Sequence, residues 1–395
     1  MNFNFTDEQQ MLRDSIGKFV REEYESAGVG VAERRKRSRK APGYNEQHWQ
    51  KFADLGWLGV PFPEEYGGIG GDLSDMMVVM EELGKGLVVE PYFPTVVLFG
   101  NALLLGGSEA QKNELIPRIV AGEIKGSLAY LEEQARGNLA DINTTARKDG
   151  QGWMLNGTKS VVQNADSADY YVVSARTSGE RTDQRGVTLF LVDAKAEGIQ
   201  RLDYETVDCM RASEVSFNDV KLGGDAVLGE VDGGLPILQG VANRAILALG
   251  AEAVGMMENL YKDTAEYTSN RVQFGHPLSQ FQTVKHRIVD MFVETELTRS
   301  LLYRATMEAQ GNHEDASLDI HALKHKVGKA GRFVGQSAVQ LHGGMGQTED
   351  LRIGHYFIRL AAIDSHFGDK DYHLARYIDL MRIPEGEADP NMLPF

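Results

Sequence analysis

The first 125 residues carry apolar side chains at helical spacing. Within Met11–Val20 they recur three or four positions apart, and Thr6 stands before them as a residue type that commonly caps a helix. A second helix is expected to end at Gly56, and a third is expected over about 74–83. The pattern therefore predicts an all-α domain over residues 1–125.

The pattern changes at about residue 126 to short β-branched and aromatic runs separated by turns. The expected strands are Trp153–Leu155, Tyr170–Ser174, Val187–Val192 and Val215–Val220. Asn156-Gly157 predicts a hairpin, because a type I′ turn needs positive φ at both central positions. Residues 126–232 are therefore predicted to form an antiparallel β-domain.

From about residue 233 the helical spacing returns in longer segments. Apolar residues between Phe281 and Met291, and again between Ile320 and Leu341, advance by threes and fours, which places one apolar stripe on each helix. Helices with such stripes pack against one another as a bundle. Residues 233–395 are therefore predicted to be a helical bundle, and the whole chain an α+β protein of three domains.

Charge and cysteine content narrow the possible functions. The net charge of −16 disfavours nucleic-acid binding as a general property, and the basic run Arg34–Lys40 is expected to be a solvated loop. The sequence predicts neither a signal peptide nor a membrane span, so we expect a cytoplasmic protein that does not bind membranes. Cys209 is the only cysteine, which excludes intrachain disulfides and thiolate metal sites, and no metal is expected.

Six local strings add a more specific signal. They are LRDSIGKFV near the start, LGWLGVPFPEEYGGIGG before the third helix, LNGTK and VSFNDV in the β-domain, and NRVQFG and AVQLHGGMG in the bundle. With these strings in this order, the chain resembles the acyl-CoA dehydrogenase family over essentially its whole length. The resemblance implies that the middle domain is an antiparallel β-barrel and the C-terminal domain a four-helix bundle. It also implies an FAD flavoenzyme that oxidises the Cα–Cβ bond of an acyl-CoA thioester and passes electrons to an electron-transferring flavoprotein.

The family's catalytic base is missing from both of its usual positions. It is commonly a glutamate in a Tyr-Glu-Gly-Thr string, and alignment on the glycine places Phe367 there. Some members carry the glutamate at the start of the first long bundle helix, where this chain has Ala245 followed by Ile246. None of these side chains accepts a proton. Asp369 is the nearest substitute carboxylate, but we expect it to cap the following helix instead.

The strings that hold the flavin ring in the family are also altered. The family's Thr-Glu-Pro and Gly-Ser-Asp strings correspond to Leu131-Glu132-Glu133 and Arg136-Gly137-Asn138, so hydroxyl donors are lost. Val161 and Gln163 stand where the family places a tryptophan and a threonine against the isoalloxazine ring. Family drift with local compensation is one interpretation, but four coincident changes favour a lost ring site.

A second set of family residues is intact. In family oligomers, an Arg-x-x-Phe-Gly string and a Gln-x-x-Gly-Gly string grip the adenosine-pyrophosphate half of a neighbouring subunit's FAD. The matching residues, with two flanking positions, are Arg271, Gln273, Phe274, Leu278, Gln340, Gly343 and Gly344. A guanidinium suits phosphate oxygens, and paired glycines let the backbone approach them. Ordinary bundle packing is the alternative, but arginine and paired glycines are poor core residues.

The resemblance therefore indicates a heteromer. In this hypothesis the chain is similar to the small, non-catalytic subunits of pimeloyl-CoA-type and steroid side-chain-type acyl-CoA dehydrogenases, and a homologous catalytic subunit supplies the base and the ring pocket. Three alternatives stay open. In the first, the chain is a self-sufficient homo-oligomer that uses Asp369, Glu132 or Glu133 as base. In the second it is a family flavoenzyme with another chemistry, and in the third it is a scaffold that binds no flavin.

Overall fold

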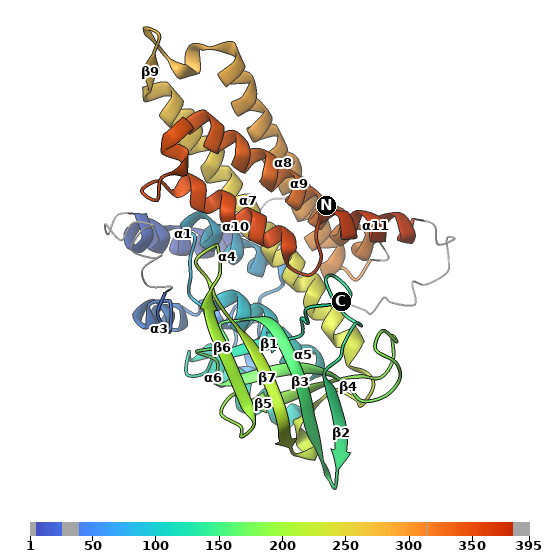
Figure 1. Cartoon of the computed structure of the whole chain (residues 1–395). Coiled ribbons are helices and arrows are strands. Elements are labelled where there is room, and N and C mark those ends of the chain that lie inside the picture. Colours follow the sequence, from blue (N-terminus) through green and yellow to red (C-terminus); the bar gives the residue numbers. More distant parts are fainter. Residues whose placement is uncertain (1–4, 26–38, 314, 382–395) are drawn as a thin grey trace. The chain divides into compact units, whose positions relative to one another are not determined.

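The computed structural model describes residues 5–25, 39–313 and 315–381, which divide into two compact units (Figure 1). Unit 1 takes the described residues of 1–35, 73–88 and 246–387, and unit 2 takes those of 36–72 and 89–245. The predicted N-terminal domain is thus shared by the two units, because its first helix and its third pack with the C-terminal helices. Most of the basic run Arg34–Lys40 lies outside the described residues.

Unit 1 is helical. Its elements are α1 (Asp7–Phe19), η1 (Val20–Glu25), α4 (Leu73–Gly86), α7 (Gly234–Asn270) from residue 246 onward, β9 (Val272–Gln273), β10 (His276–Pro277), η6 (Leu278–Gln280), α8 (Gln282–Gln310), α9 (Ala316–His342), η7 (Gly343–Gln347), α10 (Arg352–Ser365) and α11 (Lys370–Leu380). Thr6 and Gln9 form a capping box at the start of α1, which confirms the predicted cap. Helices α8, α10 and α11 all pack on α9, so the predicted helical C-terminal domain is confirmed.

Helix α7 is 37 residues long, and its composition alone would allow it to cross a membrane. However, 78% of its most apolar window is buried within the protein. The apolar residues of α7 are therefore used in packing.

A largely buried ion network joins four helices of unit 1. Arg299 of α8 binds Glu81 of α4 and lies 2.8 Å from Glu258 of α7. Arg13 of α1 lies 3.6 Å from the same Glu81 carboxylate. Because each cation faces a carboxylate from another helix, the network fixes how these helices pack.

This network predicts a loss of stability in acid. Burial would raise the pKa of Glu258, but Lys262, Lys85 and Arg299 outweigh it and lower the pKa from 4.5 to about 2. Because the folded-state pKa is depressed, this carboxylate stabilises the fold above about pH 4.5, and the contribution is lost as the pH falls toward about 2. Over that range, the urea midpoint of the wild type should fall more steeply than that of Glu258→Gln. Glu266→Gln, on an exposed position of the same helix, should keep the wild-type slope, and equal slopes for all three proteins would contradict the assignment.

Unit 2 combines helices with one sheet. Its elements are α3 (Glu46–Asp54), η2 (Trp57–Gly59), η3 (Glu64–Tyr66), η4 (Phe93–Gly100), α5 (Asn101–Gly106), α6 (Glu109–Val120), β1 (Gly126–Ala129), β2 (Thr145–Asp149), β3 (Gly152–Gln163), β4 (Tyr170–Arg176), β5 (Val187–Asp193), β6 (Ile199–Glu205), β7 (Arg211–Leu222), η5 (Gly224–Ala226), β8 (Val227–Leu228) and α7 up to residue 245. The four predicted strands lie within β3, β4, β5 and β7. Trp153, Tyr171, Phe190 and Phe217 are the aromatic residues of the core on this sheet.

The sheet is open, so the expectation of a closed barrel is wrong. Its strand order is β6-β7-β3-β2-β4-β5-β8, and β1 pairs with β4 beside this path. Closure would require β6 to pair with β8, but β6 pairs with β7 and β8 pairs with β5. The sheet is also not wholly antiparallel, because β1 and β2 both run parallel to β4.

The hairpin expected at Asn156-Gly157 is also absent, because both residues lie inside β3. The Asn156 side chain binds Asp219 across the β3–β7 ladder, and the pairing shifts register between Leu155 and Gly157. Gly157 has a φ of 147°, and a Cβ there would lie 2.5 Å from the Thr144 side chain. The glycine is needed for a bulge and a close approach, not for a turn.

Candidate cofactor site

The hairpin after α7 presents an exposed aromatic residue. Phe274 and Gly275, between β9 and β10, have φ angles of 56° and 80°. Positive φ at both positions is typical of a type I′ turn, which explains the glycine. The Phe274 side chain is 88% exposed, and among the described residues its one ring contact is edge-on to Phe281, with the ring centroids 6.2 Å apart. A large apolar side chain is therefore held in solvent on a fixed turn.

Arg271 precedes this hairpin and also faces solvent. Its backbone N–H donates to the Tyr267 carbonyl at 2.8 Å, and its own carbonyl accepts from the Leu278 N–H at 2.8 Å. Within the described residues, no side chain or carbonyl binds its guanidinium. These two hydrogen bonds hold the backbone of Arg271, and its guanidinium is free to bind a ligand.

A glycine turn follows α9 at the same end of unit 1. The Gly343 backbone has a φ of 60°, and no heavy atom lies within 4 Å of a Cβ built on Gly343 or Gly344. The turn is anchored to α7, because the His342 ring stacks on the Tyr267 ring at 4.3 Å and the Tyr267 hydroxyl donates to the His342 carbonyl at 3.4 Å. Tyr267 lies four residues before Arg271, so this contact places the glycine turn about one helical turn from the start of the hairpin.

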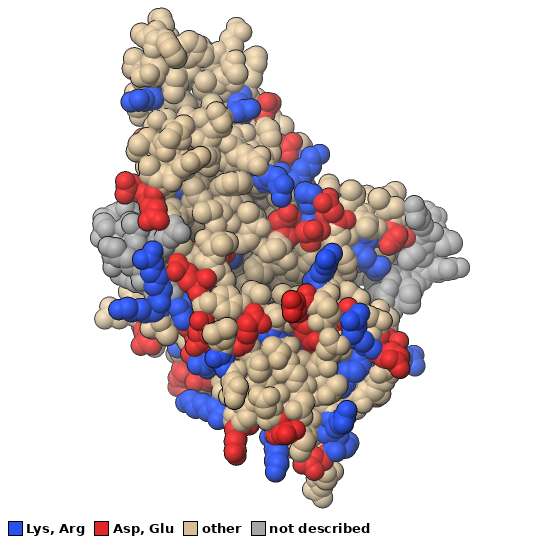
Figure 2. Space-filling model, in the orientation of Figure 1, with Lys and Arg blue, Asp and Glu red and all other residues tan. Residues whose placement is uncertain are grey.

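The seven predicted cofactor-binding residues all lie at this end of unit 1, and we call them the half-site. Leu278 is half-buried, and the six exposed residues are Arg271, Gln273, Phe274, Gln340, Gly343 and Gly344. On the face that Figure 2 shows, the end of the bundle that carries β9 is mostly uncharged. The half-site is an open surface and not part of the bundle core.

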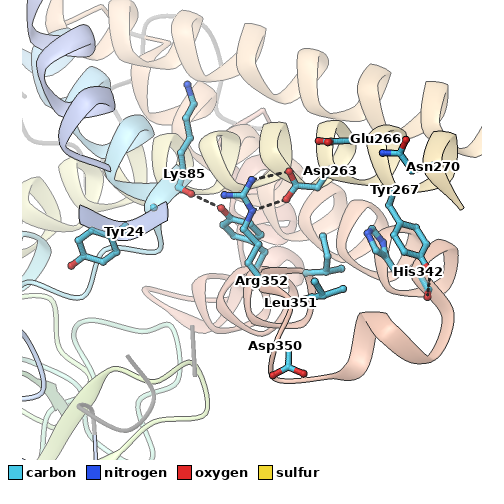
Figure 3. A pocket seen from close by; sticks show the side chains of 13 residues that line it. Tyr24, Lys85, Asp263, Glu266, Tyr267, Asn270, His342, Asp350, Leu351 and Arg352 are labelled. Carbon is cyan, nitrogen blue, oxygen red and sulfur yellow. Dashed lines mark hydrogen bonds and ion pairs between the residues drawn. The ribbon is translucent and has the colours of Figure 1, made fainter. Parts of the chain in front are cut away.

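A cavity of about 470 Å³ opens beside the half-site, within unit 1 (Figure 3). Tyr267 and His342 line one wall, and Asp263 and Arg352 form a bidentate pair on another, with N–O distances of 2.6 and 2.8 Å. The pair ties α7 to the first residue of α10. Because His342 and Arg352 flank the glycine turn in the sequence, these contacts fix both ends of the segment that carries it.

The usual base position holds an apolar ring on a fixed turn. Phe367 is 5% exposed and has a φ of 57°. The buried Lys324 amine donates to the carbonyls of Asp364 and Gly368, both at 2.8 Å, and the His373 ring donates to the Phe367 carbonyl at 3.0 Å. Burial lowers the pKa of Lys324 to about 8. The turn is therefore held by basic side chains and offers no carboxylate at the base position.

The other two candidate positions supply no base either. Ala245 and Ile246 are buried apolar residues on α7. Asp369 caps α11, because its carboxylate accepts from the backbone N–H groups of Asp371 at 3.1 Å and Tyr372 at 2.8 Å. Asp369 has the capping role expected from its position in the sequence.

Glu132 cannot serve as the base, because its carboxylate is fully engaged. It lies 2.7 Å from the buried Lys159 amine, and it accepts from the backbone N–H groups of Asn143 at 2.7 Å and Thr144 at 3.0 Å. Burial would raise the pKa of Glu132, but Lys159 outweighs it and lowers the pKa to about 2. A carboxylate with such a low pKa, whose oxygens are already paired and hydrogen-bonded, is a poor proton acceptor at neutral pH. Glu133 lies at the surface.

The ring-facing positions carry no platform for an isoalloxazine. Val161 is 36% exposed with a φ of 51°, and it lies at a register shift of β3. The Gln163 carbonyl accepts from the Ser127 hydroxyl at 2.7 Å, and the Leu131 carbonyl accepts from the Ser160 N–H at 2.8 Å. The side chains at 131 and 161 supply neither a hydroxyl nor an indole.

The described residues thus fit one half of an FAD and not the other. An unpaired guanidinium, an exposed aromatic ring and an open glycine turn at the half-site suit a pyrophosphate and an adenosine. The ring positions hold Val161 and Leu131. Of the two glutamates in the strings aligned with the family's ring site, Glu132 is the buried one, and it is already paired with Lys159.

Sequence reasoning missed the buried amines of Lys159 and Lys324. A signal for Lys324 was present, because it lies four residues after Ile320 and three before Val327, on the apolar stripe of α9. A lysine on a buried helix face needs polar partners, here two backbone carbonyls. Lys159 gives no comparable signal, because its partner Glu132 is distant in sequence.

Helix α8 exposes a row of large apolar side chains. They follow helical spacing on one face and are Val289, Phe292, Val293 and Leu297. Rows of this kind on a folded protein commonly mark a surface that another chain covers.

Comparisons with known proteins agree over nearly the whole chain. The family models for the acyl-CoA dehydrogenase N-terminal, middle and C-terminal domains match residues 6–123, 127–220 and 232–383. The mitochondrial long-chain specific acyl-CoA dehydrogenase of Sus scrofa is 29% identical over 372 residues, covering 90% of this chain and 82% of that protein.

Two solved structures have the same fold. A variant of the steroid ACAD Tcur3481-Tcur3483 is 30% identical with a TM-score of 0.84, covering 95% of this chain and 98% of that one. The ChsE4-ChsE5 complex from Mycobacterium tuberculosis is 25% identical with a TM-score of 0.86, covering 97% of this chain and 100% of that one.

Proposed function

Since this chain belongs to the acyl-CoA dehydrogenase family, we propose that it is the non-catalytic subunit of a heteromeric member and completes the FAD site of a homologous catalytic chain. The family's enzymes are oxidoreductases that act on CH–CH bonds, and FAD is their cofactor. FAD-dependent oxidation of an acyl-CoA thioester is therefore the activity to which this chain contributes.

The proposal rests on one observation, the contrast between the two parts of the flavin site. The residues that a subunit uses for its own flavin ring and base are replaced by Leu131, Val161 and Phe367. The residues that it offers to a neighbour are present at the half-site, where six of the seven are exposed and the Arg271 guanidinium is unpaired within the described residues. A homo-oligomer would need both parts in one chain, whereas a heteromer needs only the second part here.

Assembly with a second chain has separate support. The apolar row on α8 and the exposed Phe274 leave large apolar side chains in solvent. Covering them would remove apolar area from water, which favours association. Two structural relatives, Tcur3481-Tcur3483 and ChsE4-ChsE5, are named as pairs of components, which agrees with a heteromer.

The proposed substrate is an acyl-CoA of a fatty acid or a steroid side chain, and the proposed electron acceptor is an electron-transferring flavoprotein.

The proposal is tested by purifying the chain alone and after co-expression with a homologous acyl-CoA dehydrogenase chain from the same genome. Alone, it should carry little FAD and reduce no dye with acyl-CoA, because ring platform and base are both lacking. Phe367→Glu should not restore activity to the isolated chain, since a base without a positioned flavin has no hydride acceptor.

The co-expressed complex should bind FAD and turn over. One flavin per chain with turnover in the isolated protein would overturn the proposal in favour of a self-sufficient enzyme. Absence of flavin from the complex would overturn it in favour of a scaffold.

A further inference from the structure

The cavity of unit 1 is lined by a nearly buried imidazole that keeps one hydrogen-bond acceptor unused. His342 lines the cavity and is 5% exposed. Its Nδ1 lies 2.9 Å from the Ala338 carbonyl, and because a carbonyl oxygen only accepts, Nδ1 carries the proton. Burial lowers the pKa of His342, so the ring is neutral at pH 7 and Nε2 is a lone-pair acceptor. No described residue donates a hydrogen bond to this nitrogen.

Two contacts hold the His342 ring in place. Nδ1 is bound to a carbonyl of the ring's own helix, α9, so Nε2 on the other side of the ring is directed to the cavity. The Tyr267 ring stacks on the imidazole at an interplanar angle of 23°, and Figure 3 shows the two rings next to each other. The acceptor is therefore oriented before a ligand arrives, which lowers the entropy cost of binding.

The unpaired charges of the cavity lining are negative. Its two cations are already engaged, because Arg352 binds Asp263 and the Lys85 amine lies 2.6 Å from a carboxylate of α4. Glu266 of α7 and Asp350, between η7 and α10, line the cavity from different sides (Figure 3). Within the described residues, neither carboxylate makes a hydrogen bond or an ion pair. The cavity therefore favours a cation over an anion.

The other lining groups favour a flat cation with several N–H groups. The Asn270 side chain lies one helical turn after Glu266, makes no hydrogen bond within the described residues, and offers a carbonyl acceptor. Tyr24, Tyr267 and Tyr356 supply aromatic surface, on which a guanidinium stacks more readily than an ammonium. The volume of about 470 Å³ is within the range of small-molecule sites, about 300–1,000 Å³.

We propose that this cavity binds an alkylguanidinium cation, whose N–H groups donate to His342 Nε2 and Asn270 and whose charge is balanced by Glu266. A free small molecule and an arginine side chain of another protein share this chemistry. The proposal goes beyond the proposed function and does not rest on it, because neither FAD nor a catalytic chain is needed for binding.

The test titrates the full chain with butylguanidinium and with butylurea, which have nearly the same shape and differ in charge. Calorimetry should show butylguanidinium binding at least about tenfold more tightly, because only the cation is attracted by the carboxylates. Glu266→Gln should weaken butylguanidinium about two- to fivefold and leave butylurea within about twofold. Glu114→Gln, which changes an exposed and unpaired glutamate of unit 2, should leave both affinities unchanged.

A second variant tests the imidazole. His342→Phe keeps a flat ring to stack on Tyr267 but removes the acceptor, so it should weaken butylguanidinium about tenfold. Glu266 is exposed, so Glu266→Gln decides the question even where His342→Phe fails to fold. Equal affinities for the two compounds, no binding of either up to about 10 mM, or an unchanged butylguanidinium affinity in either folded variant would each overturn the proposal.

The co-expressed complex distinguishes the two sources of the cation. A site for a free small molecule should bind butylguanidinium equally well in the complex and in the chain alone. A site filled by an arginine of the catalytic chain should bind it in the chain alone and not in the complex, and His342→Phe should then weaken the complex. Loss of binding in the complex without any effect of His342→Phe on assembly would exclude the arginine as the source.

Discussion

Replacing Lys159 by methionine should lower the free energy of unfolding by about 3–5 kcal/mol, because it leaves the buried Glu132 carboxylate without its cation. The two groups are 2.7 Å apart, and Lys159 is fully buried. Methionine keeps the length of the aliphatic stem, so the change removes the charge with little loss of volume. Urea unfolding followed by circular dichroism measures the difference.

Two further variants separate the charge from the packing. Glu132→Gln should also destabilise strongly, since it leaves the ammonium buried and unpaired. The double variant Lys159→Met with Glu132→Gln should lose less than the sum of the two single losses, because it leaves no buried charge. Additive losses would show that the two side chains act independently, against the geometry. The pair between the half-buried Lys112 and the exposed Glu109 is a control, and Lys112→Met should change the free energy of unfolding by less than about 1 kcal/mol.

The fold was predictable from the sequence wherever a local pattern of apolar residues determines a single helix or strand. The helical spacing of 320–341 and the apolar run at 187–192 agree with α9 and β5. The sheet topology was not predictable this way, because the parallel pairing of β1 and β4 joins segments about 40 residues apart and leaves no local signal. Asn156-Gly157 shows the opposite problem, in which a strong local signal is overridden by a tertiary contact with Thr144.

The candidate site was predictable in its residues but not in its surroundings. Arg271, Phe274 and the two glycines come from strings whose spacing is visible in the sequence. Their exposure and the contact between Tyr267 and His342 that brings them together depend on how α7 meets α9. Glu132 illustrates the limit, since only the structure shows that a candidate base is occupied by Lys159.

Replacing Arg271 by alanine in the co-expressed complex should lower FAD occupancy on the catalytic chain. The guanidinium of Arg271 is exposed and unpaired within the described residues, which suits it to pyrophosphate oxygens from outside its own chain. Loss of a charge-assisted hydrogen bond of this kind costs about 1.5–3 kcal/mol, which corresponds to about a 10- to 100-fold weaker affinity for FAD. Flavin absorbance per complex, followed by titration of the apo-complex with FAD, measures the change.

The controls for this experiment separate the planar geometry of the guanidinium from its charge, and a role in cofactor binding from a role in subunit packing. Arg271→Lys should lose an intermediate amount, since an ammonium keeps the charge but not the planar pair of donors. Arg332→Ala, an exposed arginine on α9, should keep wild-type occupancy. Activity of Arg271→Ala should recover with excess FAD, because the partner's own base is untouched. If occupancy is unchanged while the complex dissociates, Arg271 is an interface-packing residue, and the proposal that this chain completes a neighbour's FAD site loses its main support.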